Sequence, residues 1–291
     1  MSKNHPLVSV ITPSFNQGVY IEQTIQSVLH QNYPRVEHIV VDGGSTDDTV
    51  DILKKYPHLI WISEKDRGQA DALNKGLALS KGDIVGWINS DDYYRDNIFG
   101  AVVSYFDSAD TRWVVGNLAD VFDDGSELLF RRSPKITFDA LVQGPDIVRQ
   151  QATFFRRESL AAMGGWNPDH HMAMDYDLWI RLARVSLPTM VNEDWAFFRN
   201  HAAQKSGYGN ILRQSAEITT ILQREKVALR LIVSHRIKAR WFWMKGLAKE
   251  RLIDVGIIPQ RYRLRPIRQK ARQARSAESA LRSSGNRDRQ P

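Results

Sequence analysis

Strand-like runs alternate with helical stretches over the first ninety residues, and this alternation constrains the fold more than any other feature. Between the runs, apolar residues such as Ile21, Ile25 and Val28 recur at the spacing of one helix face. Strands that alternate with helices of about 10–15 residues predict βαβ units, a parallel sheet and an α/β fold. Right-handed crossovers then give a Rossmann-like half. The apolar, β-rich runs are residues 7–11, 36–41, 59–62 and 84–88.

Each of these four runs ends in polar residues, and the carboxyl ends of parallel strands meet at one edge of a sheet, where ligands bind. The ends carry Thr12-Pro13, Asp42, residues 64–66 and Asp91-Asp92. Adjacent carboxylates repel each other, and one or two carboxylates with substrate phosphates commonly hold Mg²⁺. Taken alone, residues 89–92 also fit a solvated turn. Convergence of the four ends favours a metal site.

Several classes are excluded by what the chain lacks. There is no cysteine, so disulfides, thiol catalysis and Cys-ligated zinc are ruled out. Neither a dinucleotide fingerprint nor a phosphate-binding P-loop follows a strand. The polar N-terminus has no signal-peptide core, and no apolar window reaches about eighteen residues. We therefore expect a cytoplasmic protein.

Charge divides the chain into two parts. Residues 224–291 hold 19 Lys/Arg and 5 Asp/Glu, a net of +14, whereas residues 1–223 have a net of −7. We predict a catalytic or binding domain over 1–223 and a basic helical extension over 224–291, disordered at its end. Trp241-Phe242-Trp243 lies among basic residues, which suits an anionic membrane surface. Nucleic-acid stacking and a packing helix with a solvated basic face are the alternatives, and we expect no nucleic acid.

Further elements are predicted after residue 92. Helical spacing indicates helices near 96–106, 158–163 and 175–185, and one or two amphipathic helices over 210–235. Residues 113–122, 128–132 and 150–156 have strand character, with a turn at 123–125.

Five motifs occur in order along the chain. They are VITPSFN at 10–16, VDGGSTD at 41–47, a segment from Glu64 to Gly76 with Asp66, Gly68 and Asp71, NSDD at 89–92, and MDYDLWIRL at 174–182. Together they resemble the motifs of family 2 glycosyltransferases with the GT-A fold, over about residues 7–205. The resemblance implies a GT-A sheet with helices on both faces.

The resemblance also implies roles for individual residues. Asp42 would meet the nucleobase, typically uracil, while Asp91 and Asp92 would bind Mn²⁺ or Mg²⁺ with help from His201. Asn89 stands where the family often has Asp, which affects the ribose contact more than the metal. The implied donor-binding residues are Thr12, Pro13, Phe15, Asn16, Asp42, Lys65, Asp66, Gln69, Asn89, Ser90 and Asp91.

Asp175 would be the base that takes the acceptor's proton in an inverting transfer. An ordinary N-capping Asp is the alternative, and Asp177 is a lesser candidate because it points elsewhere on a helix. Gln150, Gln151 and Trp166 would contact the acceptor, although a polar pair on an edge strand also explains the glutamines. His170-His171 suits a loop near the acceptor cleft more than a metal site.

These features predict a metal-dependent, inverting glycosyltransferase. Its donor would be a nucleotide-diphosphate sugar, expected to be a UDP-sugar, and its acceptor a saccharide or a lipid-linked acceptor in cell-surface polysaccharide synthesis. Two alternatives stay open: a nucleotidyltransferase, and a non-catalytic module that binds a nucleotide sugar or a membrane surface.

Overall fold

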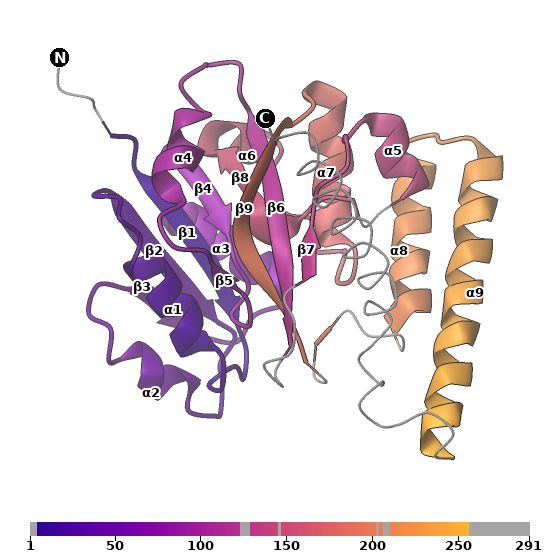
Figure 1. Cartoon of the computed structure of the whole chain (residues 1–291), viewed down its shortest axis with the longest axis horizontal. Helices are drawn as coiled ribbons and strands as arrows, with labels where there is room; N and C mark the ends of the chain where they lie inside the picture. The colour runs from indigo at the N-terminus through magenta and orange to yellow at the C-terminus, as the bar shows by residue number, and fades with distance from the viewer. Residues whose placement is uncertain (1–4, 123–128, 145–146, 202–203, 206–209, 256–291) are drawn as a thin grey trace, which may run out of the picture.

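The computed structural model describes residues 5–122, 129–144, 147–201, 204–205 and 210–255. Its centre is one curled sheet with helices on both faces (Figure 1). The strands are β1 (Val8–Ser14), β2 (Val36–Asp42), β3 (Ile60–Ser63), β4 (Ile84–Trp87), β5 (Tyr93–Tyr94), β6 (Trp113–Phe122), β7 (Leu129–Arg131), β8 (Thr153–Arg156) and β9 (Thr189–Asn200). The helices are α1 (Ile21–Leu29), α2 (Thr49–Leu53), α3 (Gln69–Leu79), α4 (Phe99–Ser104), α5 (Phe138–Gln143), the 3₁₀ helix η1 (Gln150–Ala152), α6 (Arg157–Ala162), α7 (Met174–Val185), α8 (Ile211–Arg224) and α9 (Leu229–Asp254).

The first four predicted strands form the expected parallel half. The strand order is β3-β2-β1-β4-β8-β6-β9-β5, with β7 beside β6. β1 runs parallel to β2 and β4, and β2 runs parallel to β3. Because Ser14 is level with Asp42 and Ile11 with Trp87, the loops after these strands begin at the same edge.

The strand directions in the second half of the sheet were not predicted. β8 pairs antiparallel with both β4 and β6, so the sheet is mixed. Strand β9 was not predicted, because its sequence mixes polar and apolar residues, yet it pairs with β6 in parallel. Residues 150–152 form η1 before β8 starts, and the predicted helix at 96–106 is only α4. The predicted turn at 123–125 lies outside the described residues.

A dense aromatic layer supports this half of the sheet. The Trp113 and Trp179 rings stack with centroids 5.6 Å apart, and Phe155 stacks on Trp179 at 5.7 Å. All three side chains are almost completely buried. Aromatic pairs contribute about 0.5–1.5 kcal/mol beyond their area burial. This packing fixes α7, the helix that carries Asp175, against β6 and β8.

The predicted amphipathic region near 210–235 consists of two helices, α8 and α9, which stand side by side at the right of Figure 1. Ile218, Ile221 and Leu222 of α8 and Ile232 of α9 join the main core. Arg224, where the basic extension was predicted to begin, is the last residue of α8, and the division into two domains stays a prediction. The predicted disordered end lies outside the described residues. None of the described helices is long and apolar enough to cross a membrane.

Candidate active site

The loop after β4 carries the two adjacent carboxylates. Asp92 is buried, and its oxygens accept hydrogen bonds from the Arg199 backbone N–H (2.9 Å) and the Gln151 side chain (2.8 Å). Burial, reinforced by the negative charge of Asp91, raises the pKa of Asp92 well above its usual range. Asp92 therefore anchors the loop to β9 and η1, and its carboxylate is already engaged by the protein.

Asp91 faces His201, the residue that follows β9. The His201 Nε2 atom lies 3.0 Å from the Asp91 Oδ2 atom, and 22% of the Asp91 side chain is exposed. The buried Nδ1 atom of His201 has no hydrogen-bond partner in the described part of the chain. The fold thus joins two of the three predicted metal ligands across 110 positions of sequence.

Asn89 is the centre of a side-chain network at the same strand end. Its Oδ1 atom accepts hydrogen bonds from Gln69 Nε2 (2.8 Å) and Trp87 Nε1 (2.9 Å), and its amide nitrogen donates to Gln150 Oε1 (3.2 Å). Lys205 Nζ donates to Gln69 Oε1 at 3.2 Å. Two predicted donor-binding residues, Asn89 and Gln69, therefore contact each other directly. Ser90, the next predicted donor residue, is buried in the loop.

The three predicted acceptor residues lie beneath the surface. Gln150 and Gln151 are 8% and 6% exposed and hold Asn89 and Asp92, respectively. Trp166 is fully buried with its ring edge-on to Trp87, the centroids being 5.4 Å apart. In this structure these residues pack against the strand end and loop that carry Asp91. Their direct contact with an acceptor stays a prediction.

The end of β1 lies next to the end of β4 at this edge of the sheet. Thr12 is buried against His38, with 2.9 Å between Thr12 Oγ1 and His38 Nε2. Burial lowers the pKa of His38 to about 3, so this ring is neutral. Asn16 adopts a left-handed conformation (φ 52°) and its Oδ1 accepts from Thr46 N–H at 2.9 Å. Phe15 is 58% exposed, and Pro13 is level with Val41.

Asp42 ends β2 with its carboxylate turned into its own loop. The carboxylate accepts from the backbone N–H groups of Ser45 (2.9 Å) and Gly44 (3.2 Å) and from the Ser63 hydroxyl (2.6 Å). Gly43 permits a close approach of Asp66, because a Cβ at Gly43 would lie 2.8 Å from Asp66 Oδ2. Lys65 beside it is exposed. Contact between Asp42 and a base stays a prediction and would require these hydrogen bonds to be shared.

Asp175 lies in the first turn of α7, as predicted, but it is not the N-cap. Ala173 holds that position, and Glu217 of α8 accepts from the Met172 and Ala173 N–H groups (2.7 and 3.0 Å). Desolvation lowers the pKa of Lys205, while the negative charges of Asp175 and Glu217 oppose this shift. Lys205 therefore interacts with the charge of Asp175 and, through its hydrogen bond to Gln69, with the Gln69–Asn89 network.

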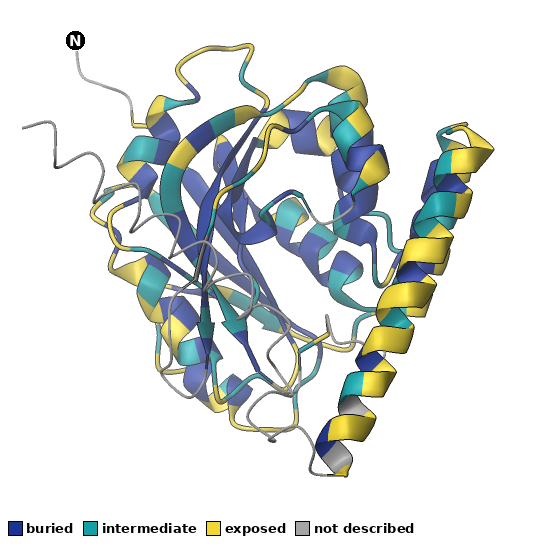
Figure 2. Ribbon diagram, turned by 45° about the vertical axis from the view of Figure 1, so that its right-hand side comes forward, coloured by how far each residue is buried: buried dark blue, intermediate teal, exposed yellow. Residues whose placement is uncertain are grey.

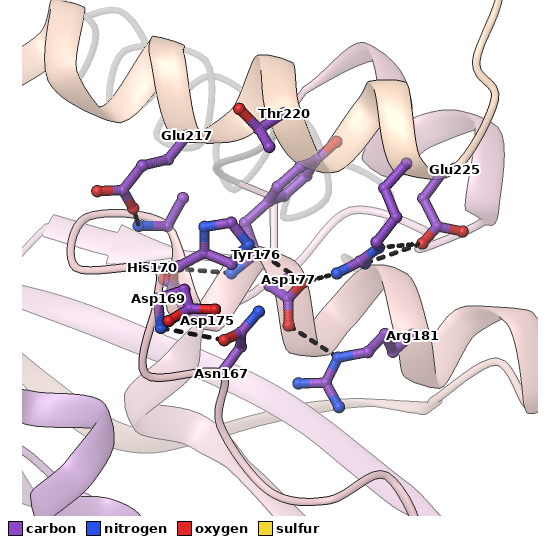
Figure 3. A network of polar contacts seen from close by, with 12 residues as sticks. Asn167, Asp169, His170, Asp175, Tyr176, Asp177, Arg181, Glu217, Thr220 and Glu225 are labelled. Carbon is purple, nitrogen blue, oxygen red and sulfur yellow. Dashed lines mark hydrogen bonds and ion pairs between the residues drawn. The ribbon is translucent and has the colours of Figure 1, made fainter.

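Asp177 belongs to a separate, buried ion-pair network (Figure 3). Its oxygens accept from Arg181 Nε at 2.7 Å and Arg224 Nη1 at 2.5 Å, and His170 Nε2 lies 3.7 Å away. Arg181 also donates to the carbonyl oxygens of Met163 and Gly165. Asp177 thereby ties α7 to α8 and to the loop before Asp175, which is a structural role.

We expect Asp177→Asn to lower the free energy of unfolding by about 3 kcal/mol, because it leaves two arginines without their shared buried carboxylate. Urea unfolding monitored by tryptophan fluorescence measures this change. Glu158→Gln is the matched control, since that side chain is 80% exposed, and we expect a change within about 0.5 kcal/mol. Equal stability of the two variants would contradict the network's role.

Several residues at the site carried no usable sequence signal. Arg199 donates through Nε to the Asp91 carbonyl (3.0 Å) and lies over the rings of Tyr20 and Tyr93. Glu217, in the α8 stretch, and Arg199, two positions before His201, read as ordinary charged residues. His170 and His171 lie in the loop before α7, with His171 Nδ1 3.3 Å from the place of a Cβ on Gly68, and a position near the acceptor stays a prediction.

Comparison with known proteins identifies the family. The sequence model described as glycosyl transferase family 2 matches residues 9–164. An uncharacterised glycosyltransferase of Mycobacterium tuberculosis is 34% identical over 191 residues, covering 64% of this chain and 72% of the relative. The putative teichuronic acid biosynthesis glycosyltransferase TuaG of Bacillus subtilis is 29% identical over 87% of this chain and 100% of its own length.

Solved structures confirm the GT-A fold. S. aureus TarS 1–349 in complex with UDP-GlcNAc matches with a TM-score of 0.59 and 14% identity, over 87% of this chain and 77% of that chain. The mannosyltransferase PcManGT of Pyrobaculum calidifontis, in complex with GDP-Man and Mn²⁺, matches with a TM-score of 0.59 and 20% identity, over 96% and 81%. A longer TarS structure is covered to only 42% of its length.

Proposed function

Because the chain belongs to glycosyl transferase family 2, we propose that it is an inverting, metal-dependent glycosyltransferase that uses a UDP-sugar. The acceptor would be a hydroxyl group of a saccharide or of a lipid-linked acceptor in cell-surface polysaccharide synthesis, at the cytoplasmic face of the membrane. The names of TuaG and of the TarS complex support this choice of donor and pathway.

One observation carries the proposal: Lys205 interacts both with the base candidate, Asp175, and with Gln69, which contacts the donor loop. Lys205 is in the field of Asp175 and donates to Gln69, which in turn donates to Asn89. Asn89 is two residues before Asp91. An acceptor hydroxyl near Asp175 would therefore lie close to a donor whose diphosphate is at Asp91.

The residues present suit a divalent cation. Asp91 offers a partly exposed carboxylate and His201 an imidazole nitrogen 3.0 Å from it, a set compatible with Mn²⁺ or Mg²⁺. The described residues contain no group of three His, Cys, Asp or Glu that could hold a metal, so the diphosphate would complete the coordination. A bound cation would stabilise the negative charge that develops on the leaving diphosphate. Asp92, also predicted as a ligand, would instead hold the Asp91 loop in place.

Asp175 would take the proton of the acceptor hydroxyl as that oxygen attacks the anomeric carbon from the face opposite the diphosphate. The bond to the diphosphate oxygen then breaks with inversion. The helix N-terminus and the Lys205 ammonium both stabilise negative charge on Asp175. A general base must carry the proton-accepting carboxylate within hydrogen-bond reach of the acceptor hydroxyl.

The two other functions make different predictions. A nucleotidyltransferase would form a new phosphate ester and release pyrophosphate, and the loop at residues 13–18 lacks the glycine-rich phosphate cradle that such enzymes use. A non-catalytic module would bind the nucleotide sugar without turnover, and it would assign no role to Asp175 in the motif at 174–182.

A donor panel tests the proposed function directly. With Mn²⁺ present, we expect UDP-sugars to release UDP at least about tenfold faster than GDP-sugars, because one or two base contacts contribute about 1–3 kcal/mol. Coupled detection of the released nucleoside diphosphate measures the rate, and boiled protein is the blank. Binding of every donor with release of none would contradict a transferase, and pyrophosphate release would indicate the nucleotidyltransferase.

A further inference from the structure

Helix α9 presents many large apolar side chains to solvent and few to the protein. Its buried positions recur every seven residues, at Ile232, Ala239, Gly246 and Ile253. Two of these four are Ala and Gly, so the inward seam is narrow. Figure 2 shows the outer side of this long helix largely in the colour of exposed residues.

The exposed apolar residues form a continuous stripe on a different face. Leu229, Val233, Ile237 and Trp241 follow one another at four-residue steps, which places them on one side of the helix. Their exposed fractions run from 45% to 72%. The stripe, here called the outer stripe, consists of Leu229, Val233, Ile237, Trp241, Met244, Leu247, Leu252 and Val255.

A helix that only covers a core keeps polar residues on its outer side. Contiguous exposed apolar surface instead marks an interaction site. On α9 this surface lies in a basic setting: the helix contains seven Lys/Arg and two Asp/Glu, a net of +5. The Lys245 ammonium lies 3.6 Å from the centroid of the Trp241 ring, so charge and apolar surface meet within the outer stripe.

This combination selects the partner. A second copy of the chain would bring two helices of net +5 together, which charge repulsion opposes. Single-stranded nucleic acid stacks on aromatic rings, yet of the nine exposed large apolar residues from 229 to 255 only Trp241 and Phe242, which lies off the outer stripe, are aromatic, and the other seven are aliphatic or Met. An anionic lipid surface suits both the apolar stripe and the basic side chains, because apolar side chains enter the acyl boundary while Lys and Arg reach the headgroups. Residues 256–291 add ten Lys/Arg against two Asp/Glu.

We propose that the outer stripe of α9 lies in the interface of an anionic membrane and holds the domain there as a peripheral protein. The benefit of membrane binding rests on the proposed function, since binding would bring the active site to a lipid-linked acceptor. The binding itself needs neither donor nor metal.

Vesicle sedimentation of the full chain, without nucleotide or metal, tests the inference. We expect pelleting with phosphatidylcholine vesicles in which about one lipid in three is phosphatidylglycerol, and far less with phosphatidylcholine alone. Raising the salt should weaken binding, because exposed charges are screened over about 8 Å at physiological ionic strength. A protein that stays in solution with anionic vesicles at low salt overturns the proposal.

Paired variants separate the outer stripe from charge in general. The double variant Ile237→Glu, Trp241→Glu should lose vesicle affinity by roughly tenfold or more, because it removes apolar burial and adds two negative charges. The double variant Val185→Glu, Leu187→Glu makes the same charge change at residues 53% and 49% exposed elsewhere, and should stay within about threefold of wild type. An equal loss of vesicle affinity in both double variants would mean that only net charge matters, and would overturn the outer stripe's role.

Two further measurements keep the outcomes distinct. Calorimetric UDP binding should be the same in wild type and in the α9 variant, so loss of vesicle binding with intact UDP binding supports the inference even if no transfer is found. Tighter binding to a single-stranded oligonucleotide than to anionic vesicles would overturn it. A dimer in solution that the α9 variant dissociates, with no vesicle binding, would also overturn it.

Discussion

Asp175→Asn should lower the turnover number by about 10²–10⁴-fold, the usual contribution of a positioned general base. The amide has nearly the shape of the carboxylate but cannot accept the acceptor's proton. Affinity for UDP should change little, since Asp175 stands on α7 rather than at the strand ends that carry Thr12, Asp42 and Asp91. Transfer to acceptor and calorimetric UDP binding, measured on the same preparation, separate the two effects.

The matched control is Asp139→Asn. Asp139 also lies in the first turn of a helix, α5, and is exposed. Its loss removes the same helix-dipole stabilisation, about 0.3–1 kcal/mol, without a base. Activity should remain within about twofold of wild type. If Asp175→Asn weakened UDP binding and kept the rate, Asp175 would be a binding residue and the proposed base would have to be found elsewhere.

Asp91→Asn should abolish the dependence of donor binding on Mn²⁺. Wild-type protein is expected to bind UDP more tightly with Mn²⁺ than in chelator, because a cation at Asp91 and His201 would bridge the carboxylate and the diphosphate. Residues that only hydrogen-bond to a metal ligand already contribute about 10–100-fold to metal affinity, so a direct ligand should contribute at least as much. Calorimetric titration of UDP with and without Mn²⁺ gives the increment for each variant.

Two variants sharpen this second test. His201→Gln should reduce the same Mn²⁺ increment, because the His201 imidazole lies 3.0 Å from Asp91. Asp51→Asn removes a carboxylate that is 75% exposed and paired with Lys54, and should leave the increment unchanged. An equal Mn²⁺ increment in wild type and Asp91→Asn would show that the carboxylate does not hold the cation. Asp92→Ala is less informative, since it also releases Gln151 and the Arg199 backbone from their acceptor.

The amino-acid sequence by itself determined the parallel half of the sheet and which polar strand ends share one edge. Both depend on local signals: apolar runs of strand length, one-face helical spacing, and polar residues directly after each run. Parallel strands must bring those polar ends to one edge, so Thr12, Asp42 and Asp91 could be placed together without knowledge of any long-range contact. Asp175 was predicted instead from the resemblance of residues 174–182 to a family motif; its position in the first turn of α7 is confirmed, and its role as base stays a prediction.

Only the tertiary structure decided what each side chain does at that edge. The roles of Asp91 and Asp92 differ because His201, Gln151 and Arg199 reach them from elements 59 to 110 positions away, and local patterns carry no information on such contacts. Gln150 and Gln151, predicted to contact the acceptor, hold Asn89 and Asp92 through contacts of the same long-range kind, and their contact with an acceptor stays a prediction.

Helix α9 shows the same division between sequence and structure. Its composition predicted a basic extension with interfacial aromatic residues. Because apolar residues occupy two faces of the helix, periodicity could not tell which face is inside, and packing against α8 and α5 chose the narrow seam of Ala239 and Gly246. That choice, made by the fit of small residues against neighbouring helices, leaves the larger apolar side chains facing outward.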